Sequence, residues 1–115
     1  MFKKSGNTLY ITRGDGGTLT LSWEGHTFPV GAEIDVNIYR ENGMDSAPLK
    51  TWSVGPLSSE LEEIEIDVSG TDTQLDSPIT EPAQYWWEAV YGDNTFIGYD
   101  EQGPKILNLY PGGPN

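Results

Sequence analysis

Few residues in this chain have the chemistry of a catalyst. The sequence holds a single histidine, His26, no cysteine, and no nucleophile-elbow or phosphate-loop pattern. His26 lies in a loop with glycine and proline and has no partner that the sequence reveals, whereas a catalytic triad demands tight geometry. We therefore expect a solvated loop histidine. The lack of cysteine excludes disulfides, thiolate catalysis and cysteine-type zinc sites.

Carboxylates are the second group that could do chemistry, because paired acids hydrolyse glycosides when an apolar pocket raises the pKa of one of them. A cluster of five lies on one segment: Glu60, Glu62, Glu63, Glu65 and Asp67. Most of them alternate with apolar residues, so we interpret the cluster as the solvated face of a strand, where like charges also deter edge-to-edge pairing. We predict that the protein is not an enzyme.

Oxygen ligands that would suit calcium are present in the predicted loops. The candidates are Asp72, Asp76, Asp93, Asp100 and Glu101. No twelve-residue calcium-binding loop with its terminal glutamate fits the sequence. We therefore predict no metal site and no cofactor.

Aromatic side chains are the best candidates for a binding surface. We expect Tyr39, Trp86, Tyr91 and Tyr99 on the outward faces of their strands. Exposed rings in a row would suit a sugar or a protein partner. The alternative is that loops or a neighbouring subunit cover this face.

One tripeptide has an adhesive interpretation. Arg13-Gly14-Asp15 spells the integrin-binding motif. Three residues match often by chance, and a glycine-rich β-turn between two strands explains this segment fully.

Length and charge narrow the classes of function. A chain of 115 residues matches one domain and is long enough to bury a core without disulfide or metal staples. Six basic and eighteen acidic residues give a formal net charge of −12, which repels phosphate backbones and anionic lipids. We therefore expect neither nucleic acid nor membrane as a partner. The first residues lack the apolar run of a signal peptide, so we expect synthesis without export.

Apolar residues recur at every second position through most of the chain, which is the pattern of half-buried β-strands. Turn residues separate the alternating segments, and an Asn-Gly pair at 42–43 marks a hairpin turn. The pattern predicts eight strands, over residues 7–12, 18–23, 33–40, 49–54, 61–68, 84–91, 95–99 and 105–109.

Two segments leave room for helical structure. Residues 61–68 could form a helix because Glu and Leu favour helices, but the strict alternation of apolar and acidic side chains favours a strand. At most one helical turn is expected near residues 70–76, with Thr71 or Asp72 as its cap and Leu75 in the core.

The strands predict an all-β fold in which two antiparallel sheets bury their apolar faces against each other. This sandwich forms one domain over residues 1–110, and residues 111–115 form a flexible tail. The predicted core consists of Leu9, Ile11, Leu19, Leu21, Trp23, Ile34, Val36, Ile38, Trp52, Ile64, Ile66, Val68, Tyr85, Trp87, Leu107 and Leu109.

Five motifs follow one another along most of the chain. A Thr-Arg-Gly-Asp turn and a Thr-rich strand lie within residues 11–21, and a middle strand spans 34–40. An aromatic Tyr-Trp-Trp-Glu strand begins at Tyr85, and a closing Gly-Pro strand begins at Gly103. This order resembles small immunoglobulin-like domains of tailed phages and prophages of Gram-positive bacteria, such as the N-terminal domains of baseplate upper proteins.

The resemblance implies an immunoglobulin-like β-sandwich of seven or eight antiparallel strands. It also implies a non-enzymatic structural role in a phage tail, baseplate or fibre, made in the bacterial cytoplasm and located in the virion. The implied partners are other phage structural proteins or copies of the chain itself in a homo-oligomer. The chain ends at Asn115 without a receptor-binding region, which favours an assembly or decoration role. The alternative is a carbohydrate-binding or adhesion module that uses Trp86 and the outward tyrosines.

Overall fold

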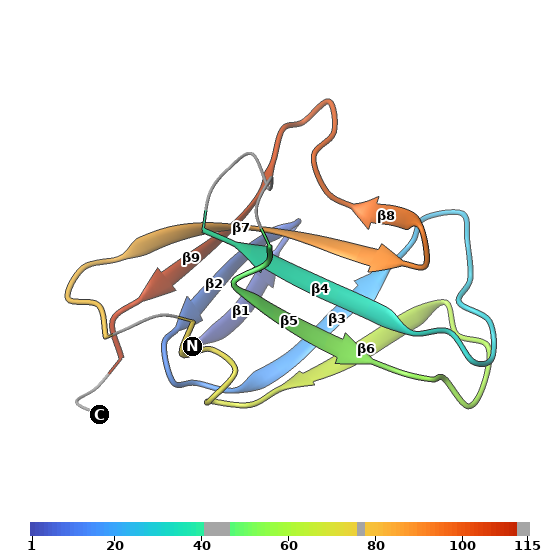
Figure 1. The fold of residues 1–115 in the computed structure, drawn as a ribbon, viewed down its shortest axis with the longest axis horizontal. Helices are drawn as coiled ribbons and strands as arrows, with labels where there is room; N and C mark the ends of the chain where they lie inside the picture. The colour runs from blue at the N-terminus through green and yellow to red at the C-terminus, as the bar shows by residue number, and fades with distance from the viewer. Residues whose placement is uncertain (41–46, 76–77, 113–115) are drawn as a thin grey trace.

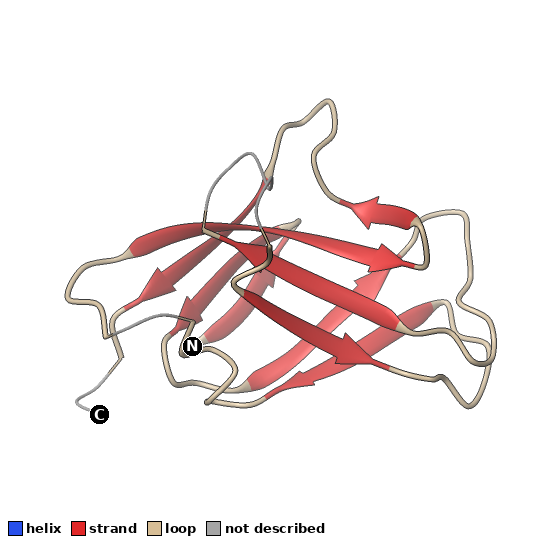
Figure 2. Ribbon diagram, in the orientation of Figure 1, coloured by secondary structure: helices blue, strands red, loops and turns tan. Residues whose placement is uncertain are grey.

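The computed structural model of the chain describes residues 1–40, 47–75 and 78–112. Within these ranges it contains strands and turns and no helix (Figures 1 and 2). The strands are β1 (Phe2–Ser5), β2 (Thr8–Thr12), β3 (Gly17–Ser22), β4 (Ile34–Tyr39), β5 (Lys50–Val54), β6 (Glu63–Val68), β7 (Ala83–Tyr91), β8 (Asn94–Ile97) and β9 (Lys105–Tyr110).

The strands form a seven-stranded sheet and a two-stranded sheet. The larger sheet has the order β1-β2-β9-β7-β4-β5, and β8 pairs with the last part of β7 with a register shift between Ala89 and Val90. The smaller sheet consists of β3 and β6. Because β5 runs beside β6 and β1 comes close to β3, the larger sheet curls around the smaller one (Figure 1).

The facing sides of the two sheets are apolar and form the core. In the smaller sheet the register pairs Leu19 with Ile66 and Leu21 with Ile64, and all four side chains are buried. The alternation that predicted these strands is therefore confirmed, and the helical alternative for residues 61–68 is wrong. Every residue of the predicted core is buried except Trp23, which is partly buried and packs against the core.

One strand pair contradicts the prediction of purely antiparallel sheets. β2 runs parallel to β9, with Leu9 beside Leu107 and Ile11 beside Leu109. Parallel neighbours need a long crossover, and here nearly the whole chain lies between the two strands. Alternation within each strand carries no information about such a distant pairing, so the sequence could not reveal it.

The N-terminal strand β1 was absent from the predicted elements. Its sequence, FKKS, has a single apolar residue and therefore no readable alternation. Phe2 packs on Trp52 with 6.3 Å between ring centroids and lies against Gly17, where a side chain would collide with its ring. Tertiary contact thus specifies this strand. Its two lysines, Lys3 and Lys4, are exposed at the sheet edge, where lysine disfavours pairing with other chains.

The predicted helical turn is a hydrogen-bonded turn at 70–73 rather than a helix. The Ser69 N–H donates to the Asp72 carboxylate at 3.1 Å, and the Asp72 N–H donates to the Ser69 hydroxyl at 3.2 Å. This reciprocal pair is the capping-box arrangement, so Ser69 takes the role that was predicted for Thr71 or Asp72. Leu75 is buried as predicted. The Asn-Gly pair at 42–43 and the last three tail residues lie outside the described residues.

Two buried tryptophans fasten loops to the core. The Trp87 indole N–H donates to the Asn7 carbonyl at 3.2 Å, and the Trp52 indole N–H donates to the Asp72 carbonyl at 3.1 Å. A buried indole without an acceptor would cost free energy, and both rings avoid that cost. No buried side-chain nitrogen or oxygen of the described residues lacks a hydrogen-bond partner.

Replacing Trp87 by alanine is expected to lower the free energy of unfolding by ~3–5 kcal/mol, because the ring is fully buried and its removal leaves a cavity. Urea denaturation followed by circular dichroism measures the loss. The matched control is Trp86→Ala, which truncates the adjacent, outward-facing ring and should cost much less. Equal losses for the two variants would contradict the placement of Trp87 in the core.

Candidate functional site

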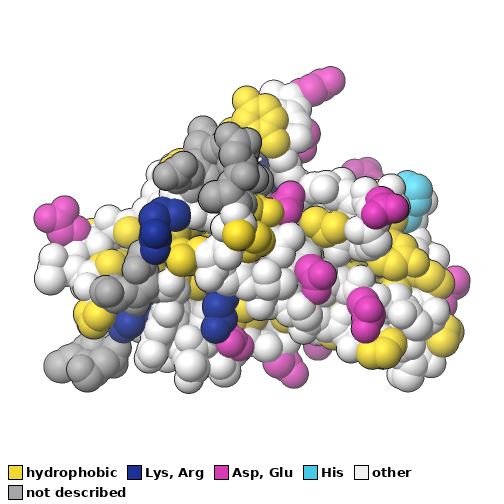
Figure 3. All heavy atoms as spheres, viewed as in Figure 1, with side chains coloured by type: hydrophobic (Ala, Val, Ile, Leu, Met, Phe, Trp, Pro, Cys, Tyr) yellow, Lys and Arg dark blue, Asp and Glu magenta, His cyan; other side chains and the backbone are white. Residues whose placement is uncertain are grey.

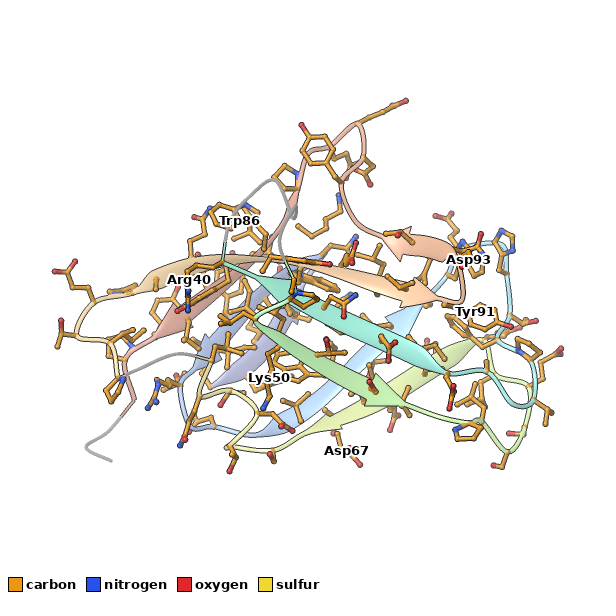
Figure 4. The ribbon with its side chains drawn as sticks, in the orientation of Figure 1. Arg40, Lys50, Asp67, Trp86, Tyr91 and Asp93 are labelled. Carbon is orange, nitrogen blue, oxygen red and sulfur yellow. The ribbon has the colours of Figure 1, made fainter. Side chains whose placement is uncertain are left out.

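The outer face of the larger sheet is the surface best suited to binding. The register sets Tyr39 on β4 opposite Trp86 on β7, and Trp86 opposite Ile106 on β9. Because Tyr85 and Trp87 turn into the core, Trp86 points outward, where it is half-buried. Figure 4 shows Trp86 at the first half of β7. Sheet alternation therefore places one large ring at the centre of three strands.

We use the name uncharged patch for the outward side chains of β2, β9 and the first half of β7. They alternate with buried core residues, and all except the exposed Gln84 are half-buried. None of them carries a charge. The patch consists of Thr8, Tyr10, Thr12, Gln84, Trp86, Ile106, Asn108 and Tyr110.

A hydrogen-bonded chain of side chains borders the patch on β5, β4 and β7. The Thr51 hydroxyl donates to the Asn37 amide oxygen at 2.9 Å, and the Asn37 amide donates to Glu88 at 3.0 Å. The Tyr39 hydroxyl donates to the same carboxylate oxygen of Glu88 at 2.7 Å. These bonds span three adjacent strands and fix the rotamers of their members, so this side of the face is pre-organised.

Tyr39 is held protonated by its surroundings. Burial, the hydrogen bond to Glu88 and the negative charge of Glu88 together raise the pKa of the Tyr39 phenol to about 12. All three favour the neutral phenol over the phenolate. Tyr39 therefore acts as a hydrogen-bond donor that orients Glu88, and it offers no acid–base chemistry near neutral pH.

The four aromatic residues predicted as a surface do not form one row. Tyr39 belongs to the outer face but is only 7% exposed. Tyr91 instead shares the inner face with Trp87 and packs against Trp23 and Phe28, so its predicted outward position is wrong. Tyr99 is 72% exposed, but it follows β8 in a loop. The structure thus brings together only Tyr39 and Trp86.

The acidic strand lies on a different face from the uncharged patch. Glu63, Glu65 and Asp67 on β6 are exposed and point away from the core, and Asp67 accepts a hydrogen bond from the Thr18 hydroxyl at 3.2 Å. Carboxylates in this setting are solvated and lack the apolar pocket that acid catalysis requires. Acidic side chains are also scattered over the view in Figure 3, whereas Lys and Arg gather in its left half.

An open cleft of about 550 Å³ lies at the end of β3. Trp23, His26, Glu24, Glu62 and Glu63 contribute to its lining. The His26 ring stacks on Trp23 with 4.0 Å between centroids, and His26 is exposed, as expected for a loop histidine. The indole of Trp23 also meets the rings of three further residues, which are Phe28, Tyr91 and Phe96. It serves as packing for the loops rather than as an open platform for a sugar.

Two of the predicted loop carboxylates, Asp72 and Asp100, are engaged in local structure. Asp100 accepts hydrogen bonds from the Lys105 ammonium at 2.8 Å and from the Gln102 N–H at 2.9 Å, and these bonds hold the pKa of Asp100 below its usual value. The hydrogen bond from the Ser69 N–H likewise lowers the pKa of Asp72. Within residues 1–40, 47–75 and 78–112 no group of three His, Asp or Glu side chains could hold a metal ion. Asp76 lies outside these ranges.

The Arg-Gly-Asp turn is tied into the fold. Arg13 is buried, and the Gly14 N–H donates to the Thr73 hydroxyl at 2.9 Å. Asp15 forms an ion pair with the N-terminal ammonium of Met1. A β-turn held at all three positions explains the tripeptide without an adhesive role.

Comparisons with protein families, curated proteins and solved structures found no match to this chain. No helix among the described residues is long and apolar enough to cross a membrane. Any function must therefore be argued from the site itself.

The tyrosine–glutamate contact can be tested by titration. Because folding raises the pKa of Tyr39 from 10.0 to about 12, through burial first and Glu88 second, the neutral phenol stabilises the fold fully below pH 10, and this stabilisation is lost as the pH rises through about 12. In Glu88→Gln the phenol should ionise at a lower pH, though still above 10 because burial remains. Ultraviolet absorbance of tyrosinate measures the shift, with Tyr39→Phe assigning the transition. An unchanged midpoint in Glu88→Gln would show that Glu88 exerts no such effect.

Proposed function

We propose that this chain is a non-enzymatic assembly module that works through protein contacts on the uncharged patch, within an immunoglobulin-like β-sandwich. The observation that carries the proposal is the set of half-buried, uncharged side chains around Trp86 on a protein with a net charge of −12. A surface with this composition has no charged group to desolvate when another protein covers it, and its aromatic rings supply contact area.

The strand arrangement supports the immunoglobulin-like assignment. Such folds place strands C, F and G side by side in one sheet and strands B and E in the other. Variable-type members add a strand next to C. Here β4, β7 and β9 lie side by side with β5 next to β4, while β3 and β6 form the facing pair. The correspondence rests on strand order and chain direction.

The chemistry of the patch supports a protein partner. The centres of protein interfaces are depleted in charge and enriched in tyrosine and tryptophan. The patch offers Tyr10, Tyr110 and Trp86 together with Ile106, and it contains no lysine, arginine, aspartate or glutamate. Interface energy concentrates in a few aromatic or arginine anchors. We assign the anchor role to Trp86. Its position on β7 is fixed by its neighbours Tyr85 and Trp87, which are buried in the core.

The placement of this module in a phage or prophage particle is a narrower proposal. It is supported by the order of the Thr-Arg-Gly-Asp turn, the Tyr-Trp-Trp-Glu strand and the Gly-Pro strand, which resembles phage tail, baseplate and fibre domains. In that setting the partners are structural proteins of the virion or further copies of the chain. A protein that acts by contact alone requires no catalytic residues.

A carbohydrate-binding role is the second candidate, favoured by the outward ring of Trp86 beside the amides of Gln84 and Asn108. It is the weaker candidate because Tyr39 and Tyr91 present no open ring to solvent. A glycan array, followed by tryptophan fluorescence titration of the protein and of Trp86→Ala, separates the two. Saturable binding that Trp86→Ala abolishes would favour the sugar.

Site-specific photo-crosslinking tests the proposed function. A benzophenone amino acid replaces Asn108 in the patch or, as the control, the exposed Thr20 on the opposite sheet, in cells that produce the particle. We expect adducts at position 108, identified by mass spectrometry as a particle protein or a second copy, and none at position 20. Failure to form adducts at 108, or equal adducts at both positions, would contradict a contact role for the patch.

A further inference from the structure

We infer that the uncharged patch binds a second copy of this chain, so that two copies bury it against each other. The inference rests on the proposed contact function of this face and identifies its partner. Three properties of the described residues carry it: the distribution of charge, the mixture of side chains in the patch, and the position of β9 at its centre.

Charge decides which partner fits the patch. The chain carries a net charge of −12, yet the eight side chains of the patch contribute nothing to it, and its neighbour on β1 is the cation Lys3, opposite Tyr10. A basic partner would be drawn to the carboxylates of Glu63, Glu65 and Asp67 on the other sheet or to those of the cleft, because complementary charge steers association. The patch offers such a partner no attraction. A surface that is itself uncharged does fit it, and a second copy presents one.

Pairing through the patch also minimises repulsion between two acidic molecules. When the larger sheets face each other, the acidic β6 faces point away on opposite sides of the pair. Contact through β6 would instead bring like charges within a few ångströms, where repulsion is strongest. Contact through the patch therefore brings identical copies together at less electrostatic cost than contact through β6.

The side chains of the patch can form hydrogen bonds and apolar contacts with the same side chains of a second copy. The amides of Gln84 and Asn108 both donate and accept hydrogen bonds, and so do the hydroxyls on β2 and β9. Trp86 and Ile106 supply apolar area beside them. A two-fold interface brings the same surface from each copy together, so it requires this self-complementarity.

Strand order gives the pairing a geometry. β9 lies between β2 and β7. A two-fold axis parallel to β9 in the interface would lay β7 of one copy over β2 of the other. Trp86 of each copy then meets the hydroxyl-bearing surface of β2 between Thr8 and Tyr10, and Asn108 lies close to the axis.

Sedimentation equilibrium over a range of concentration and salt tests the inference. We expect a monomer–dimer equilibrium that strengthens as salt rises from about 0.05 to about 0.5 M, because salt screens the repulsion between acidic copies. A contact made by opposite charges would weaken instead. Trp86→Arg should raise the dimer Kd at least about tenfold, as loss of an anchor does. The matched control, Thr20→Arg on β3, should leave the Kd within about twofold of wild type, since its surface lies outside the interface.

Because the chain has no cysteine, single-cysteine variants provide a second test that leaves the tryptophan in place. Under mild oxidation Asn108→Cys should form a disulfide-linked dimer at concentrations where Thr20→Cys stays largely monomeric. Circular dichroism melting of each variant confirms that it folds before it is compared.

Three outcomes would overturn the inference: a monomer at every concentration and salt, a dimer that Trp86→Arg leaves unchanged, or faster cross-linking at position 20 than at 108. A monomer that still yields photo-adducts at 108 with another protein overturns only the inference, and the proposed function stands. The absence of both dimer and adducts overturns the two together.

Discussion

Burial of the two facing apolar layers is the constraint on which the rest of the structure depends. Trp87 lies in this core with no exposed surface, and the Leu19–Ile66 and Leu21–Ile64 pairs belong to the same core from the smaller sheet. Period-two alternation means that each residue committed to this core turns its neighbour outward. The position of Trp86 on the outer face is a direct consequence of the position of Trp87 in the inner one.

The same constraint gives the molecule one acidic face and one uncharged face. On β6, alternation turns three acids outward, whereas on β2, β9 and the first half of β7 it turns only uncharged residues outward. Solvation stabilises the acidic face, and like charge keeps other acidic molecules from it. The uncharged patch lacks this repulsion, so the proposed partner can cover it without desolvating a charge. The proposed contact function rests on this asymmetry and requires no reactive group.

Sequence patterns predicted the strands but not all of their neighbours. Strands such as β3 and β6 could be predicted because alternation is a local property, while β1 and the parallel β2–β9 pair depend on contacts between distant residues. The candidate site was predicted in part. The outward position of Trp86 could be predicted from alternation along β7. The inward position of Tyr91 could have been predicted in the same way, because Tyr91 is an even number of residues from Trp87. The bonds that link Thr51, Asn37, Glu88 and Tyr39 required the register between strands, which the sequence does not contain.

The central claim is that the face bearing Trp86 is covered in the working protein while the face bearing β6 remains in water. Hydroxyl-radical footprinting at low and high protein concentration measures this most directly, because it reports side-chain exposure at both faces in one experiment. The account predicts that Trp87 stays unlabelled throughout and that labelling of Trp86 and Tyr10 falls as concentration rises, while labelling of the β3–β6 face stays constant. Constant labelling of Trp86 together with protection of the β3–β6 face would contradict it.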